Sequence, residues 1–199
     1  MTQPTSSRHV LPLPLTIADI TNDWLTAALR TQSPGVTVNS SEVVNVINGT
    51  CTKIRIRLEM DDAGKQAGIP ETVILKGGFE SHSRNMFVTH EKEVRAYRDF
   101  LPRFNLRTPA CYFAEMDIEA RQGIVIIEDL VARGVNFCHP QQPQSHQAVT
   151  NRLSALAQFH AASWSDDQYL APEWSWIKDY LMSSHLYMQT YLKPEIWQH

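Results

Sequence analysis

Lys76 and the acidic segment that follows it are the first residues whose types and spacing suggest chemistry. Lys76 ends the apolar run Val73-Ile-Leu-Lys76, and Glu91 and Glu93 follow in a segment with helical periodicity. A lysine on a strand needs an ionic partner if its ammonium group is enclosed. Held by a glutamate on a helix, it would be placed to contact the α- and β-phosphates of a nucleotide. We expect Glu93 to be that partner because it adjoins the apolar Val94; the alternative is a solvated lysine at a strand end.

A second candidate is the predicted turn 48–52, Asn-Gly-Thr-Cys-Thr. Backbone N–H groups in a tight turn can bind an anion, and Gly49 allows close approach. Asn48, Gly49, Thr50 and Thr52 would then cover phosphates. The chain has only 8 glycines and no GxGxxG motif. An ordinary hairpin turn is therefore the alternative.

The third candidate is Ile126-Ile-Glu-Asp-Leu130, where an apolar strand runs into a short acidic linker. A carbonyl at Glu128 and an N–H at Leu130 would pair with the edge of adenine, with Asp129 between them. Ile127 would limit the depth of the base slot. The alternative is a buried strand that ends in a turn.

The elements that must position these residues follow from periodicity. Residues 51–60 alternate, which predicts a strand with Ile54 and Ile56 on a buried face and Lys53 and Arg55 on a wet one. Helical spacing predicts the helices 21–30, 84–101, 149–164 and 173–192. The other predicted strands are 43–47, 72–76, 108–115 and 123–130, and 61–70 is predicted to be a polar loop.

This order predicts an α+β fold with three parts. Residues 1–15 would form a loose N-terminal arm. Residues 16–130 would form a lobe built on an antiparallel sheet, and residues 131–199 the start of a helical lobe.

Taken together, the motifs resemble those of a known superfamily. The chain is similar to the aminoglycoside phosphotransferase and choline kinase-like proteins, which have a protein-kinase-like fold, and most of all to their ecdysteroid kinase-like (CHK kinase-like) branch. The resemblance covers about residues 16–165. It is carried by Asn48–Thr52, Val73–Lys76, Glu91–Pro102, Ile126–Leu130 and Leu156–Trp164, the last similar to an LAxLHAxxW helix.

The resemblance implies ATP as the nucleotide and the hydroxyl of a small molecule as the phosphoryl acceptor. Relatives use an HGDxxxxN-type loop and a later D-F/W-Q-type motif for catalysis and Mg²⁺. Neither motif occurs in this sequence: Asp166, Asp167 and Asp179 lack the histidine and asparagine spacing. Phosphoryl transfer needs these groups. We therefore expect no catalytic residue and no metal site in this chain, with Mg²⁺ bound only in a longer protein of which it is the N-terminal part.

Two other interpretations stay open. The chain would be a stand-alone, catalytically inactive binding module that self-associates through exposed C-terminal helices. Alternatively, it would be an α+β domain without a nucleotide site, which requires Lys76 to lie far from both Glu91 and Glu93.

Composition excludes several classes of protein. The 199 residues are 43% hydrophobic with a net charge of −3, which argues against disorder and against a nucleic-acid binder. No apolar run approaches the ~20 residues of a membrane helix. Three scattered cysteines, Cys51, Cys111 and Cys138, form no disulfide framework or metal motif. We therefore expect a cytoplasmic protein.

Overall fold

A computed structural model describes residues 11–49, 51–139 and 141–178. The chain divides into two compact units, Met1–Pro143 and Gln144–His199. The strands are β1 (Val38–Ile47), β2 (Thr52–Met60), β3 (Thr72–Gly77), β4 (Cys111–Asp117) and β5 (Gln122–Glu128). The α-helices are α1 (Asn22–Arg30), α2 (Asp62–Gln66), α3 (Phe87–Arg95), α4 (His146–Ser163) and α5 (Ser175–Lys178). The 3₁₀ helices are Ile17–Asp19, Ser83–Met86, Leu101–Arg103, Asp167–Leu170 and Pro172–Trp174, and Ala96–Phe100 is a π-helix.

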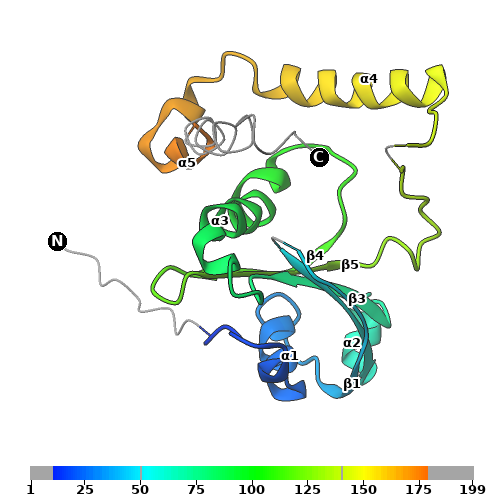
Figure 1. Cartoon of the computed structure of the whole chain (residues 1–199), viewed down its shortest axis with the longest axis vertical. Coiled ribbons are helices and arrows are strands. Elements are labelled where there is room, and N and C mark those ends of the chain that lie inside the picture. The colour runs from blue at the N-terminus through cyan, green and yellow to red at the C-terminus, as the bar shows by residue number, and fades with distance from the viewer. Residues whose placement is uncertain (1–10, 50, 140, 179–199) are drawn as a thin grey trace, which may run out of the picture. The chain divides into compact units, whose positions relative to one another are not determined.

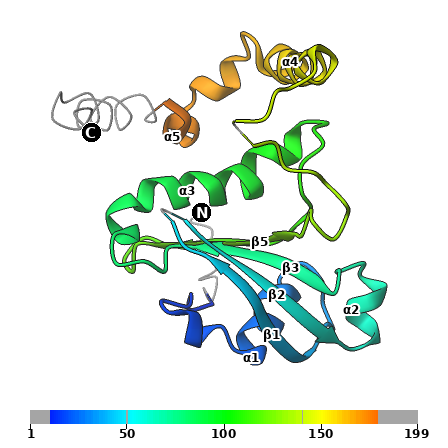
Figure 2. The same ribbon diagram turned by 45° about the vertical axis from the view of Figure 1, so that its right-hand side comes forward.

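The first unit is built on one five-stranded sheet in the order β1-β2-β3-β5-β4, in which every neighbouring pair is antiparallel. Helix α1 lies on one face of the sheet and α3 on the other (Figures 1 and 2). The α+β prediction with an antiparallel sheet is confirmed. Strand β2 alternates as predicted, with Ile54 and Ile56 buried and Lys53 exposed.

The face beneath α1 carries the main core. Thr21 caps α1 by accepting a hydrogen bond from the Trp24 N–H at 3.1 Å, which fixes where the helix begins. The apolar side of α1, with Leu25 and Leu29, packs in this core. Trp24 and Phe113 of β4 pack edge to face with ring centroids 5.5 Å apart. The opposite face has a smaller buried cluster under α3, formed by Val94, Ala114, Val125 and Ile127.

Several predicted elements differ from the structure. The predicted loop 61–70 contains α2, because the Asp61 carboxylate accepts from the Gly64 N–H at 3.0 Å and caps a helical turn. Strand β1 begins at Val38, earlier than predicted. The predicted helix 84–101 is a 3₁₀ turn, then α3, then a π-helical segment.

The described part of the predicted arm is packed and not loose. Leu13 is buried, and the Pro12 carbonyl accepts from the Trp24 indole N–H at 2.9 Å. The side-chain amide of buried Gln122 donates to the Pro14 carbonyl at 2.8 Å and accepts from the Gly78 N–H at 2.9 Å. These bonds tie the start of the chain to the sheet.

In the second unit, α4 confirms the predicted helix 149–164. The Ser145 hydroxyl accepts from the Ala148 N–H at 3.2 Å and caps it. The predicted helix 173–192 is described only to residue 178, where it comprises a 3₁₀ turn and α5. Among the described residues, no helix is both long and apolar enough to span a bilayer.

Candidate nucleotide-binding site

The lysine of β3 and a glutamate of α3 form an ion pair. The Lys76 ammonium contacts Glu93 Oε1, and the two side chains are 18% and 24% exposed. Glu91 is engaged elsewhere, by Arg95 one helical turn later at 2.8 Å. The expected choice of Glu93 over Glu91 is confirmed. The interpretation without a nucleotide site required Lys76 to be distant from both glutamates, and the geometry does not meet that requirement.

The charge of Glu93 also affects the pKa values of neighbouring side chains. The Cys51 thiol donates to Glu93 Oε2 at 3.7 Å. Burial, reinforced by the Glu93 charge, raises the pKa of Cys51 to about 11 and that of Tyr97 to about 12. Burial is also the main cause that raises the pKa of Cys111 to about 11. These neighbouring thiols and the phenol are neutral at pH 7 and add no charge to the site. The charge of Glu93 is balanced by Lys76.

Close packing of α3 on β5 fixes where Glu93 lies. A Cβ on Gly123 would come within 3.0–3.1 Å of His90, including its backbone. Only glycine lets the helix approach the strand this closely. His90 is buried, no described residue forms a hydrogen bond with its Nε2, and burial lowers its pKa. The helix is therefore held on the sheet by a neutral imidazole one turn before Glu93.

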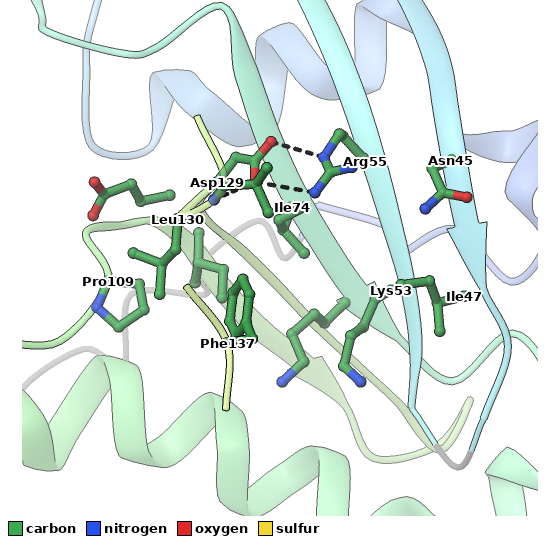
Figure 3. A pocket seen from close by; sticks show the side chains of 13 residues that line it. Asn45, Ile47, Lys53, Arg55, Ile74, Pro109, Asp129, Leu130 and Phe137 are labelled. Atoms are coloured by element: carbon green, nitrogen blue, oxygen red, sulfur yellow. Dashed lines mark hydrogen bonds and ion pairs between the residues drawn. The ribbon is translucent and has the colours of Figure 1, made fainter. Parts of the chain in front are cut away.

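A cavity of about 420 Å³ opens on the face of the sheet that carries Lys53 and Arg55 (Figure 3), and Lys76 is among its lining residues. It lies within the first unit. Its lining residues are Asn45, Ile47, Lys53, Arg55, Ile74, Lys76, Pro109, Ile127, Glu128, Asp129, Leu130, Val131 and Phe137. This size is within the ~300–1,000 Å³ range of small-molecule sites. The pocket brings Lys76 together with the four residues Ile127–Leu130 that were predicted to hold the base.

The segment after β5 ends in a tight turn. Its N–H to carbonyl bonds run from Ala132 to Asp129 at 3.1 Å, from Gly134 to Val131 at 2.9 Å and from Val135 to Leu130 at 3.0 Å. Gly134 takes φ +76° there, which glycine adopts without strain. The Leu130 N–H has no acceptor among the described residues and is available to a ligand.

Glu128 and Asp129 use their carboxylates within the protein. Glu128 pairs with Arg133 at 3.1 Å. Asp129 is 4% exposed and pairs with Arg55 of β2, at 2.8 Å from Nε and 3.4 Å from Nη2 (Figure 3). The Glu128 N–H donates to the Ala110 carbonyl at 2.8 Å and the Asp129 carbonyl accepts from the Ala132 N–H at 3.1 Å, so the part of these two residues in base binding stays a prediction.

The predicted phosphate-covering turn lies outside the lining of this cavity. Asn48 is exposed and Gly49 half-buried, and Thr50 lies outside the described residues. Thr52 is fully buried and lies on the α1 face with Ile54, opposite the pocket. Its hydroxyl therefore points away from Lys76, and its part in phosphate binding stays a prediction.

Sequence reasoning missed the two cations of β2 that line the pocket. In the β2–β3 register, Lys53 lies directly opposite Lys76 and Arg55 opposite Ile74. Alternation in 51–60 had placed both on a wet face. The signal that could have found them is the hairpin pairing of this strand with Val73–Lys76, which puts that face beside Lys76. Phe137, 66% exposed, was also missed because it lies in an irregular segment.

Comparison with known families decides the kinship of the chain. The model of the ecdysteroid kinase-like family matches residues 48–173, more than half of the chain. The chain belongs to this family. The match begins at the hairpin turn and includes Lys76, Glu93 and the segment after β5. No curated protein and no solved structure matches the chain.

Family membership implies a small-molecule kinase-like function, which in general uses ATP. The pocket fits a nucleotide: lysines lie at one end and Ile74, Ile127 and Leu130 supply apolar walls. The residues do not fit a magnesium cage. Within the described part of the chain, no three His, Cys, Asp or Glu side chains gather where a metal could bind.

Proposed function

We propose that the pocket of the first unit binds ATP for transfer of its γ-phosphoryl group to the hydroxyl of a small molecule. The observation that carries the proposal is the pair Lys53–Lys76. These side chains are directly opposite each other on neighbouring strands. Like charges in this position destabilise a sheet. Of the described residues only Glu93 forms an ion pair with either lysine, so one positive charge is left over for an anion.

The remaining groups suit the rest of ATP. The polyphosphate would lie against Lys53 and Lys76, and the turn 48–52 would cover it with backbone N–H groups. The base would lie against Ile74 and Ile127, which are opposite each other on β3 and β5, and accept from the Leu130 N–H. Glu93 would hold Lys76 in place. The acceptor hydroxyl and the group that orients it are not supplied by these residues, so we propose nucleotide binding, not turnover, for the first unit.

Titration of the purified 199-residue chain with ATP tests this proposal. Calorimetry should show saturable binding, and the melting temperature should rise with ATP as mass action requires. Lys76→Met should weaken ATP binding at least roughly tenfold, because a charge-assisted contact is lost. Lys65→Met is the matched control, since Lys65 is 72% exposed, pairs with Asp62 and lies outside the pocket. The proposal is overturned if the wild-type chain does not bind ATP, or if Lys76→Met binds ATP as tightly as the wild type.

A further inference from the structure

The two ends of the pocket differ in charge. The Lys53–Lys76 end has one positive charge more than its ion pair with Glu93 can match. At the other end, the positive charge of Arg55 is matched by Asp129, which is almost fully buried beside it. A phosphate would therefore gain less at Arg55 than at the lysines. Arg55 lines the pocket, yet its charge is already neutralised.

The ion pair fixes the plane of the Arg55 guanidinium. Asp129 receives two of its N–H groups, at 2.8 Å and 3.4 Å. Asp129 is in turn held by the Val131 N–H, which donates to Oδ1 at 3.1 Å. These contacts use the edge of the guanidinium and leave its faces. Arg55 keeps 26% of its side chain exposed at the pocket.

A planar, weakly hydrated guanidinium stacks on π systems. Arg55 lies opposite Ile74, at the end of the pocket where Ile127 and Leu130 would receive the base. We propose that Arg55 stacks on the nucleobase, with Asp129 as the positioning residue that orients it, and that this contact favours purine over pyrimidine nucleotides. This inference rests on the proposed function and adds its base selectivity. A purine offers the larger ring system for such stacking.

The test compares ligands with and without a base. Dissociation constants for ATP, CTP and inorganic tripolyphosphate are measured by calorimetry on the 199-residue chain and its variants. Arg55→Lys keeps the charge but loses the plane. It should weaken ATP binding roughly tenfold, the size of a lost base-stacking contact, weaken CTP less, and leave tripolyphosphate within about twofold. Asp129→Asn should change the ratio of ATP to tripolyphosphate affinity in the same direction and by less.

Arg57→Lys is the matched control. Arg57 lies two residues further along the same face of β2 and also pairs with a carboxylate, that of Glu42 at 2.5 Å, but it does not line the pocket. It should leave all three affinities unchanged. If Arg55→Lys does not fold, Arg55→Gln is measured instead. This variant keeps a planar end group without charge, and its ratio of ATP to tripolyphosphate affinity is compared with that of the wild type.

Three results overturn this inference alone and leave the proposed function standing. Equal losses for ATP and tripolyphosphate would assign Arg55 to the phosphates. A lower melting temperature with an unchanged affinity ratio would assign the Arg55–Asp129 pair to stability alone. Equal losses for ATP and CTP would remove the purine selectivity. A wild-type chain that binds neither ATP nor tripolyphosphate overturns the proposed function and this inference with it, and is distinguished from the other results by the wild-type titration.

Discussion

The two faces of the sheet are built from the same strands but do different things. The α1 face is a continuous apolar core in which Ile54, Leu75 and Phe113 are fully buried. The α3 face divides into a small cluster around Val94 and a pocket lined by charged and half-buried side chains. Strand alternation produces both faces at once. The α1 face therefore contributes most of the stability of the sheet. The α3 face can carry charged residues that do not stabilise the fold.

The largest expected effect comes from the core. Phe113→Ala should lower the free energy of unfolding by about 3–5 kcal/mol, because it removes a fully buried ring that packs on Trp24. Ile74→Ala, on the half-buried pocket face, should cost clearly less and should weaken ATP binding. Urea unfolding of both variants measures the difference. Equal losses of stability would contradict the division between the two faces.

A smaller effect should connect stability with the site. Gly123→Ala should cost about 1–3 kcal/mol, because the added methyl group meets His90 at 3.0–3.1 Å and pushes α3 from β5. Since α3 carries Glu93, ATP affinity should fall as well. Gly68→Ala is the control: at φ +72° it should also cost stability, but Gly68 does not line the pocket, so ATP affinity should stay unchanged. Thermal unfolding and ATP titration report the two effects, and a stable Gly123→Ala with full affinity would argue against this role of the packing.

The buried imidazole of α3 should make stability depend on pH. Burial lowers the pKa of His90 below its ordinary 6.5, so below about pH 6.5 the unfolded chain binds more protons than the folded one. The free energy of unfolding should therefore fall as the pH drops below about 6.5 and should not vary from this cause above it. His90→Leu should reduce this dependence between about pH 5 and 7. His139→Gln, which replaces an exposed histidine, is the control and should leave this pH dependence unchanged. Equal slopes of the free energy of unfolding against pH in the wild type, His90→Leu and His139→Gln would exclude His90 as the source.

The smallest expected change in stability is a gain. Lys53→Thr removes one of two lysines that lie directly opposite each other and should stabilise the ligand-free chain by about 0.2–1 kcal/mol. ATP binding should weaken at the same time, because the excess positive charge is lost. Urea unfolding without ligand and calorimetry with ATP measure both. A stabilised variant with undiminished ATP affinity would show that Lys53 serves neither the fold nor the nucleotide.

Local patterns predicted those parts of the molecule that depend on near neighbours. The period of residues 52–60 predicted which side of β2 is buried, and the neighbourhood of Val94 indicated Glu93 as the partner of Lys76. Alternation could not say what lies across from Lys53 and Arg55, because that depends on strand register. Nor could it show that the Asp129 carboxylate turns to Arg55, since β5 ends at Glu128 and alternation ends with it.

The π-helical segment and α2 escaped prediction for another reason. The segment Ala96–Phe100 has the apolar spacing of an α-helix, and only its backbone bonds reveal the wider turn. Helix α2 is five residues long and depends on the Asp61 cap, whereas its polar composition is typical of a loop. In both cases the deciding interaction involves backbone groups that residue types alone do not specify.

The amide of Gln122 sets a limit on how far the chain can be shortened from its beginning. Its nitrogen donates a hydrogen bond to the Pro14 carbonyl, and its oxygen accepts one from the Gly78 N–H, next to the end of β3. The same amide nitrogen also donates to the Gly78 carbonyl at 3.3 Å, so shortening to Thr16 would remove one of its two acceptors, at a cost of about 0.5–1.5 kcal/mol. The same loss would loosen the loop that follows Lys76. Residues 11–15, which precede the first helix, thus add to the stability of the sheet that carries Lys76.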